Sequence, residues 1–136
     1  MRLAGALLAL ALAACAAPAA TPPAPEAAAL GEQRSEAGAV TVVAAWLDGP
    51  VPSLRVALDT HSVDLDGFDL AASARLRIDG GAWVAPSAWD APTGGHHRSG
   101  TLTFAALAVG AVGAARTIEL EIRDVAAESR LLRWQR

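Results

Sequence analysis

Apolar and polar residues alternate along most of the chain after residue 38, which is the pattern of β-strands with one buried face. The first such segment carries on its apolar face Val40, Val42, Ala44 and Trp46. Five later segments repeat the pattern, with apolar faces formed by Leu54, Val56 and Leu58; Leu76 and Ile78; Leu102 and Phe104; Ile118, Leu120 and Ile122; and Leu132 and Trp134. The turn sequence Asp79-Gly80-Gly81 predicts a hairpin into one more strand at residues 82–86.

Seven short strands separated by turn residues predict an all-β fold, a single antiparallel β-sandwich over residues 38–136. The pattern resembles an immunoglobulin-like or fibronectin-type-III-like domain, although the cysteine pair of antibody domains is absent from the sequence. That resemblance implies an architecture and no particular function. A small barrel is the alternative. Residues 105–115 are apolar but broken by glycines, and we expect a loop or one helical turn there.

The first fifteen residues follow a different pattern. Arg2 precedes an unbroken apolar run at residues 3–12, which ends in Ala13-Ala14-Cys15. This is the layout of a secretory signal peptide, and the run is shorter than the roughly 20 residues that span a bilayer. The sequence Leu12-Ala13-Ala14-Cys15 also resembles the lipobox of bacterial lipoproteins.

The lipoprotein resemblance implies cleavage before Cys15, acylation of Cys15 and attachment of the domain to a membrane outside the cytoplasm. Two or more acyl chains give a stable anchor. Ala16 stands where an aspartate would favour retention in the inner membrane, so the resemblance leans toward the outer membrane. An uncleaved apolar tail and a plain secretory signal are the alternatives.

Domain boundaries follow from these patterns. Residues 1–14 are predicted to be the signal peptide and residues 38–136 the folded domain. Between them, residues 15–37 are rich in alanine and proline and contain few bulky apolar side chains. Such a segment buries too little apolar surface to offset its ordering entropy, so we expect a tether that begins at the lipidated Cys15.

Composition excludes several classes of function. Cys15 is the single cysteine, so a lipidated chain has no thiol left for a disulfide, a thiolate metal ligand or a nucleophile. All eleven basic residues are arginine, the net charge is −3, and no basic stripe suggests nucleic-acid binding. The sequence holds no G-x-S-x-G nucleophile elbow, which makes a hydrolase the least favoured class.

All three histidines lie in two turn-rich segments, residues 59–70 and 89–100. Neutral imidazole suits zinc and copper. His61, His96 and His97, with Asp59 or Asp64, are therefore candidate ligands of a divalent transition metal if the two segments meet. The alternative is structural: one histidine packs beneath a tryptophan and another bonds to a backbone carbonyl.

Calcium is a weaker candidate. The pattern Ser62-x-Asp64-x-Asp66-Gly67 imitates the start of an EF-hand loop. However, the first ligand position is Ser62, and Ser73 stands at position twelve, where a glutamate is needed. A solvated acidic loop shaped by turns is the preferred interpretation.

The two segments together carry a resemblance of their own. The pairing of THSVDLxxxDL with WxxPxGGHHxSGxLxF is similar to that of a group of secreted bacterial proteins that have no established activity. The resemblance covers most of the predicted domain, and it implies a pattern of residues without a mechanism.

The four tryptophans suggest a second kind of site. Trp46 and Trp134 occupy inward strand positions and are predicted core residues. Trp83, Trp89 and Arg98 are candidates for a contact with an envelope protein or a glycan, with packing over the sheet end as the alternative. The sequence as a whole predicts a lipid-anchored extracytoplasmic binding module that is not an enzyme.

Overall fold

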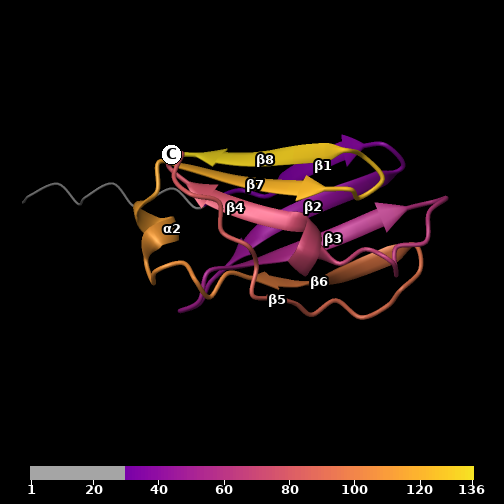
Figure 1. The fold of residues 1–136 in the computed structure, drawn as a ribbon, viewed down its shortest axis with the longest axis horizontal. Helices are drawn as coiled ribbons and strands as arrows, with labels where there is room; N and C mark the ends of the chain where they lie inside the picture. The colour runs from indigo at the N-terminus through magenta and orange to yellow at the C-terminus, as the bar shows by residue number, and fades with distance from the viewer. Residues whose placement is uncertain (1–29) are drawn as a thin grey trace, which may run out of the picture.

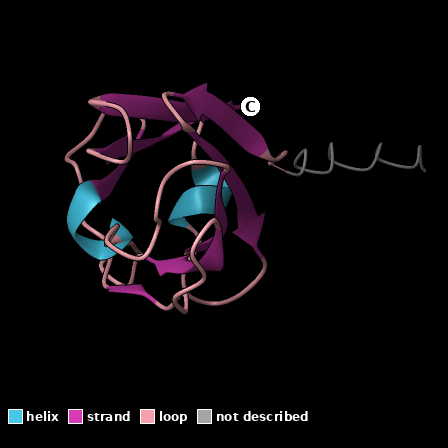
Figure 2. Ribbon diagram, turned by 90° about the vertical axis from the view of Figure 1, so that its right-hand side faces the viewer, coloured by secondary structure: helices cyan, strands magenta, loops and turns pink. Residues whose placement is uncertain are grey.

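The predicted all-β sandwich is confirmed. A computed structural model of the protein describes residues 30–136, so the signal peptide, Cys15 and tether residues 15–29 lie outside the described residues. The strands form two antiparallel sheets, five-stranded β1-β2-β3-β6-β5 and three-stranded β4-β7-β8 (Figure 1). Figure 2, turned by 90°, looks along the strands.

The elements are short and follow the predicted segments closely. The strands are β1 Gln33–Ala37, β2 Val40–Leu47, β3 Ser53–Thr60, β4 Ala74–Ile78, β5 Ala88–Trp89, β6 His97–Thr103, β7 Thr117–Arg123 and β8 Ser129–Gln135. The two helices, α1 Leu70–Ser73 and α2 Ala111–Ala114, are single turns. The second confirms the helical turn expected within residues 105–115.

Strand order matches the constant-type immunoglobulin arrangement. In that arrangement one sheet has the order A-B-E-D and the other C-F-G. Here β2-β3-β6-β5 and β4-β7-β8 follow the same two orders, and β1 adds a strand beside β2. Because Gln33–Ala37 pair with β2, the folded domain begins earlier than residue 38, inside the segment predicted as a tether.

The inward side chains of both sheets form one core, as their alternation predicted. Leu54, Leu58, Phe104 and Leu120 are fully buried within it. At one end, the rings of Trp46 and Trp134 meet edge to face with centroids 5.6 Å apart. Trp134 is buried, whereas Trp46 is half-buried at the margin of the core.

The predicted hairpin strand at residues 82–86 is wrong. Only Val84 pairs with β4, through two backbone hydrogen bonds to Leu76. Pro86 has no N–H to continue a ladder, and the chain instead crosses to the other sheet as β5, which pairs with β6. Strand β6 begins at His97, several residues before Leu102 and Phe104, the apolar positions from which it was predicted.

The sandwich has two ends with different composition, at the left and right of Figure 1. The proximal pole, where the described chain begins, comprises residues 47–52 and 104–116, including α2. The distal pole comprises the turn at residues 38–39, the loops at 61–69 and 90–96, and the turn at 124–128. Figure 1 shows the C-terminus at the proximal pole.

Candidate functional site

The predicted metal ligands lie at the distal pole, where two of them come together. His97 on β6 faces Asp59 on β3 across the sheet, with Nδ1 and Oδ1 2.7 Å apart. Both side chains are well exposed, at 72% and 46%. His96, just before β6, also has an exposed side chain, and its carbonyl accepts a hydrogen bond from the Thr60 N–H.

The predicted five-residue ligand set is not assembled. Across residues 30–136, no three histidine, cysteine or carboxylate side chains are grouped closely enough to hold a metal ion. His97 is the first residue of a strand, and its ring is already paired with Asp59. His61, His96 and Asp64 are exposed and do not join that pair in such a group.

The acidic loop at residues 61–69 forms hydrogen-bonded turns, as the sequence predicted. Asp64 Oδ1 accepts a hydrogen bond from the Asp66 N–H at 2.9 Å. Asp66 Oδ1 in turn accepts from the N–H groups of Gly94 and Gly95, at 2.8 and 3.1 Å. These two backbone donors, that of Gly94 first, hold the pKa of Asp66 below its usual value.

Arg98 ties the same loops together from β6. Its guanidinium donates to four backbone carbonyls, those of Leu65, Phe68, Ala91 and Pro92. Its central carbon also lies 5.9 Å from the centroid of the Trp89 ring, within cation–π range. These contacts give Arg98 a structural position between the distal loops, and its predicted role in a partner contact stays a prediction.

The two candidate tryptophans lie in different environments. Trp89 packs against the core beside β6, and its buried Nε1 has no hydrogen-bond partner among the described residues. Trp83 lies on the outer face of the β4-β7-β8 sheet, with the guanidinium carbons of Arg75 and Arg77 each 4.5 Å from its ring centroid. The contact predicted to combine Trp83, Trp89 and Arg98 is therefore not formed as one surface.

Ion pairs run across the outer face beneath Trp83. Arg75 pairs with Glu121, and Glu119 is held between Arg77 and Arg133. Glu119 is 4% exposed. Hydrogen bonds from Arg77 and then Arg133 hold its pKa below the usual range, despite burial, which acts in the opposite direction.

This cluster was not predicted, although the sequence carries a signal for it. Arg75 and Arg77 alternate with the apolar residues of one strand, and Glu119 and Glu121 do so on another. The missing information was the register, which places Arg75 opposite Glu121 and Arg77 opposite Glu119. Trp83 then reaches the cluster from the loop that follows β4.

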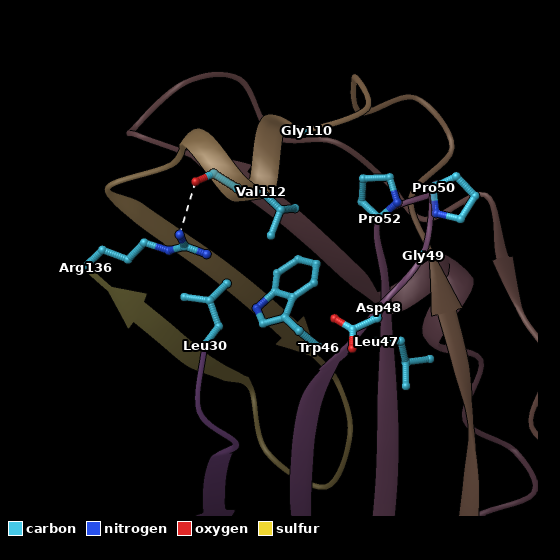
Figure 3. A pocket seen from close by; sticks show the side chains of 11 residues that line it. Leu30, Trp46, Leu47, Asp48, Gly49, Pro50, Pro52, Gly110, Val112 and Arg136 are labelled. Atoms are coloured by element: carbon cyan, nitrogen blue, oxygen red, sulfur yellow. Dashed lines mark hydrogen bonds between the residues drawn. The ribbon is translucent and has the colours of Figure 1, made fainter. Parts of the chain in front are cut away.

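A hollow of about 540 Å³ opens at the proximal pole (Figure 3). Its lining includes Leu30, Trp46, Val112 and the β2–β3 loop, and Asp48 and Arg136 are its two ionisable residues. Arg136 donates a hydrogen bond to the Gly113 carbonyl at 3.1 Å. The buried Nε1 of Trp46 has no partner among residues 30–136.

Apolar side chains are exposed around this hollow. Of the four large apolar residues exposed in the described chain, three belong to the proximal pole: Leu47 at 37%, Val51 at 41% and Val109 at 79%. Residues 105–115 include no charged side chain. The sequence of this segment predicted only its local structure, because its alanines and glycines carry no reactive group.

No helix among residues 30–136 has the length and apolar character needed to cross a membrane. Comparisons with known proteins found no matching family model, no matching curated protein and no matching solved structure. The function must therefore be inferred from the residues of this chain.

Proposed function

We propose that the protein is a lipid-anchored extracytoplasmic binding module that contacts an acidic envelope protein through the outer face of the β4-β7-β8 sheet. The anchoring part rests on residues 1–15, where signal peptide and lipobox patterns coincide. The binding part rests on one observation, the position of Trp83 over Arg75 and Arg77 on an outward sheet face.

Tryptophan and arginine are the residue types that most often dominate the energy of protein interfaces. Here they are also held in place before binding, since Arg75 and Arg77 each pair with a glutamate of β7. Side chains that are already ordered lose less conformational entropy when a partner binds. Leu131, 48% exposed on β8, adds an apolar contact on the same face.

Charge indicates the kind of partner. The outward positions of the three strands include two glutamates, Glu119 and Glu121, and four arginines, Arg75, Arg77, Arg123 and Arg133. This face therefore carries an excess of positive charge in a chain whose net charge is −3. A complementary partner presents carboxylates, which also steer its approach.

This function requires neither a metal nor a reaction, and we propose that the protein is not an enzyme. The histidine–carboxylate pair His97–Asp59 stands on the outward face of β3 and β6, where both side chains are open to solvent. A catalytic base works in a site that excludes water and positions a substrate. An exposed sheet face provides neither.

The test is site-specific photocrosslinking in intact envelopes. A photoreactive phenylalanine analogue replaces Leu131 on the proposed face or Arg55 on the outer face of the other sheet, where Arg55 is exposed. We expect discrete adducts from position 131, digestible by protease, and few from position 55. The same experiment in a Trp83→Ala background should remove most of the adducts at position 131.

Two results would contradict the proposal. One is an equal adduct yield and pattern from positions 131 and 55, and the other is an unchanged yield in the Trp83→Ala background. Adducts that resist protease but yield to glycosidases would instead identify a glycan as the partner. Circular dichroism of each variant checks that the sandwich remains folded.

A further inference from the structure

We infer that the proximal pole rests on the surface of the lipid bilayer, with Leu47, Val51 and Val109 at the boundary between headgroups and acyl chains. The inference builds on the lipid anchor in the proposed function and adds the orientation of the domain. It also assigns a role to the apolar surface beside the hollow, which the partner-binding face does not use.

The surface chemistry of this pole suits lipid. Val109 is 79% exposed in a turn of the segment at residues 105–115, which has no charged side chain. Leu47, the last residue of β2, also lines the hollow, and Val51 follows Pro50 in the β2–β3 loop. Exposed apolar residues gathered at one place on a soluble domain mark a contact with protein or membrane.

The path of the chain selects lipid over protein as the occupant. Leu30, the first described residue, lines the hollow, so the chain reaches the domain at this pole. Fourteen residues lie between Cys15 and Leu30, and a chain of that length spans at most about 50 Å even when extended. An acylated Cys15 would thus keep this pole within about 50 Å of the bilayer, where a weak apolar contact is favoured by effective concentration.

The distribution of charged side chains also favours the proximal pole as the end that faces the bilayer. The distal pole exposes six carboxylates, those of Asp64, Asp66, Asp69, Asp90, Asp124 and Glu128. At the proximal hollow, Asp48 is balanced by Arg136. Anionic lipids repel the distal carboxylates, so the domain should stand on its proximal pole with the β4-β7-β8 face turned sideways and open to a partner.

The test uses the single cysteine of the chain. When Cys15 is acylated, a cysteine introduced elsewhere is the sole free thiol and takes the sole nitroxide label. The processed full chain is purified as Val109→Cys, Val51→Cys or His96→Cys, labelled, and reconstituted in phosphatidylcholine–phosphatidylglycerol vesicles. Collision of the nitroxide with oxygen, which is enriched in lipid, is compared with collision with a water-soluble nickel chelate.

We expect positions 109 and 51 to collide with the nickel chelate at least about threefold less often than position 96, because an interfacial apolar face inserts about 5–10 Å. Oxygen collisions should rise at the same two positions. Equal accessibility at positions 109, 51 and 96 in protein that floats with the vesicles would overturn the inference and leave the anchor intact.

Failure of the anchor itself gives a different result. A chain with a free Cys15 takes two labels in each variant and one in the unsubstituted protein, and it does not float with vesicles. That outcome would overturn both the anchor and the orientation that rests on it. Protection of position 96 rather than position 109 would show that the opposite pole faces lipid.

Discussion

The two poles of the sandwich differ in how extensively charged side chains bond to the backbone of their loops. At the distal pole, charged side chains bond to the backbone: Asp66 accepts from Gly94 and Gly95, and Arg98 donates to four carbonyls. Arg130, 4% exposed, likewise donates to carbonyls of Ala37, Val40 and Val125. At the proximal pole, glycine, proline and apolar residues line most of an open hollow, and only Asp48 and Arg136 carry charge there.

The difference shows that reactive residue types do not by themselves mark a site. The distal pole has the histidines and aspartates, yet several of its charged groups serve to fix loops against one another. The proximal pole has chemically plain residues but presents the exposed apolar surface. Substitutions at matched positions of the two poles should therefore have very different effects on stability.

The largest expected difference involves two glycines with positive φ. A Cβ at Gly38 (φ +63°) would lie 1.9 Å from the Ala126 carbonyl oxygen, whereas a Cβ at Gly110 (φ +82°) meets nothing within 4 Å. We expect Gly38→Ala to reduce the free energy of unfolding by about 3–4 kcal/mol and Gly110→Ala by about 1 kcal/mol. Urea denaturation of both variants measures this, and equal losses would contradict the contrast between the poles.

Loss of the Arg98 contacts should be the next largest effect. Arg98→Met keeps most of the side-chain volume but removes every donor to the loop carbonyls, and we expect a loss of about 2 kcal/mol. Amide hydrogen exchange should accelerate in residues 65–68 and at Ala91, with the proximal pole unchanged. The matched control is Arg55→Met on an exposed strand position, which should be nearly neutral.

A third prediction concerns pH and the sheet between the poles. The pKa of Glu119 is lowered by Arg77 and Arg133, so its stabilising contribution is present above the ordinary carboxyl pKa and is lost as pH falls through the lowered value. Glu119→Gln should therefore be less stable than the native protein by about 1 kcal/mol at neutral pH, and this gap should close in acid. A gap that stays constant as the pH is lowered would contradict the assignment.

The smallest effect is expected at the His97–Asp59 pair. Because both side chains are exposed, His97→Ala should change the free energy of unfolding by less than about 0.5 kcal/mol. Equilibrium dialysis of this variant and the native protein against Zn²⁺ extends the test. If the native protein binds one equivalent of Zn²⁺ tightly and His97→Ala does not, His97 is a metal ligand, which the arrangement of the side chains does not support.

Much of the fold was predictable because alternation depends on local sequence. The buried faces of β2, β3, β7 and β8 follow the apolar positions that the chain itself displays. β1 was missed because Gln33–Ala37 lack such an apolar face and owe their strand to pairing with β2. β5 was missed because two residues are too few to show a period.

The candidate site was less predictable because it depends on register and on space between segments. Trp83 could be named from sequence, but its partners Arg75 and Arg77 were identified only once the loop after β4 was placed. Conversely, His61 and His96 were predicted to be metal ligands because both are histidines in turn-rich segments. In the folded chain both are exposed, and neither belongs to a group of three possible ligands among residues 30–136. The exposed valine at position 109 gave no chemical signal at all.

We propose that a lipid on Cys15 holds this domain outside the cytoplasm, and mass spectrometry of the native protein determines whether that lipid is present. We expect an N-terminal peptide that begins at Cys15 and carries the mass of its acyl chains, with residues 1–14 removed. An intact Met1 followed by an unmodified Cys15 thiol would contradict it.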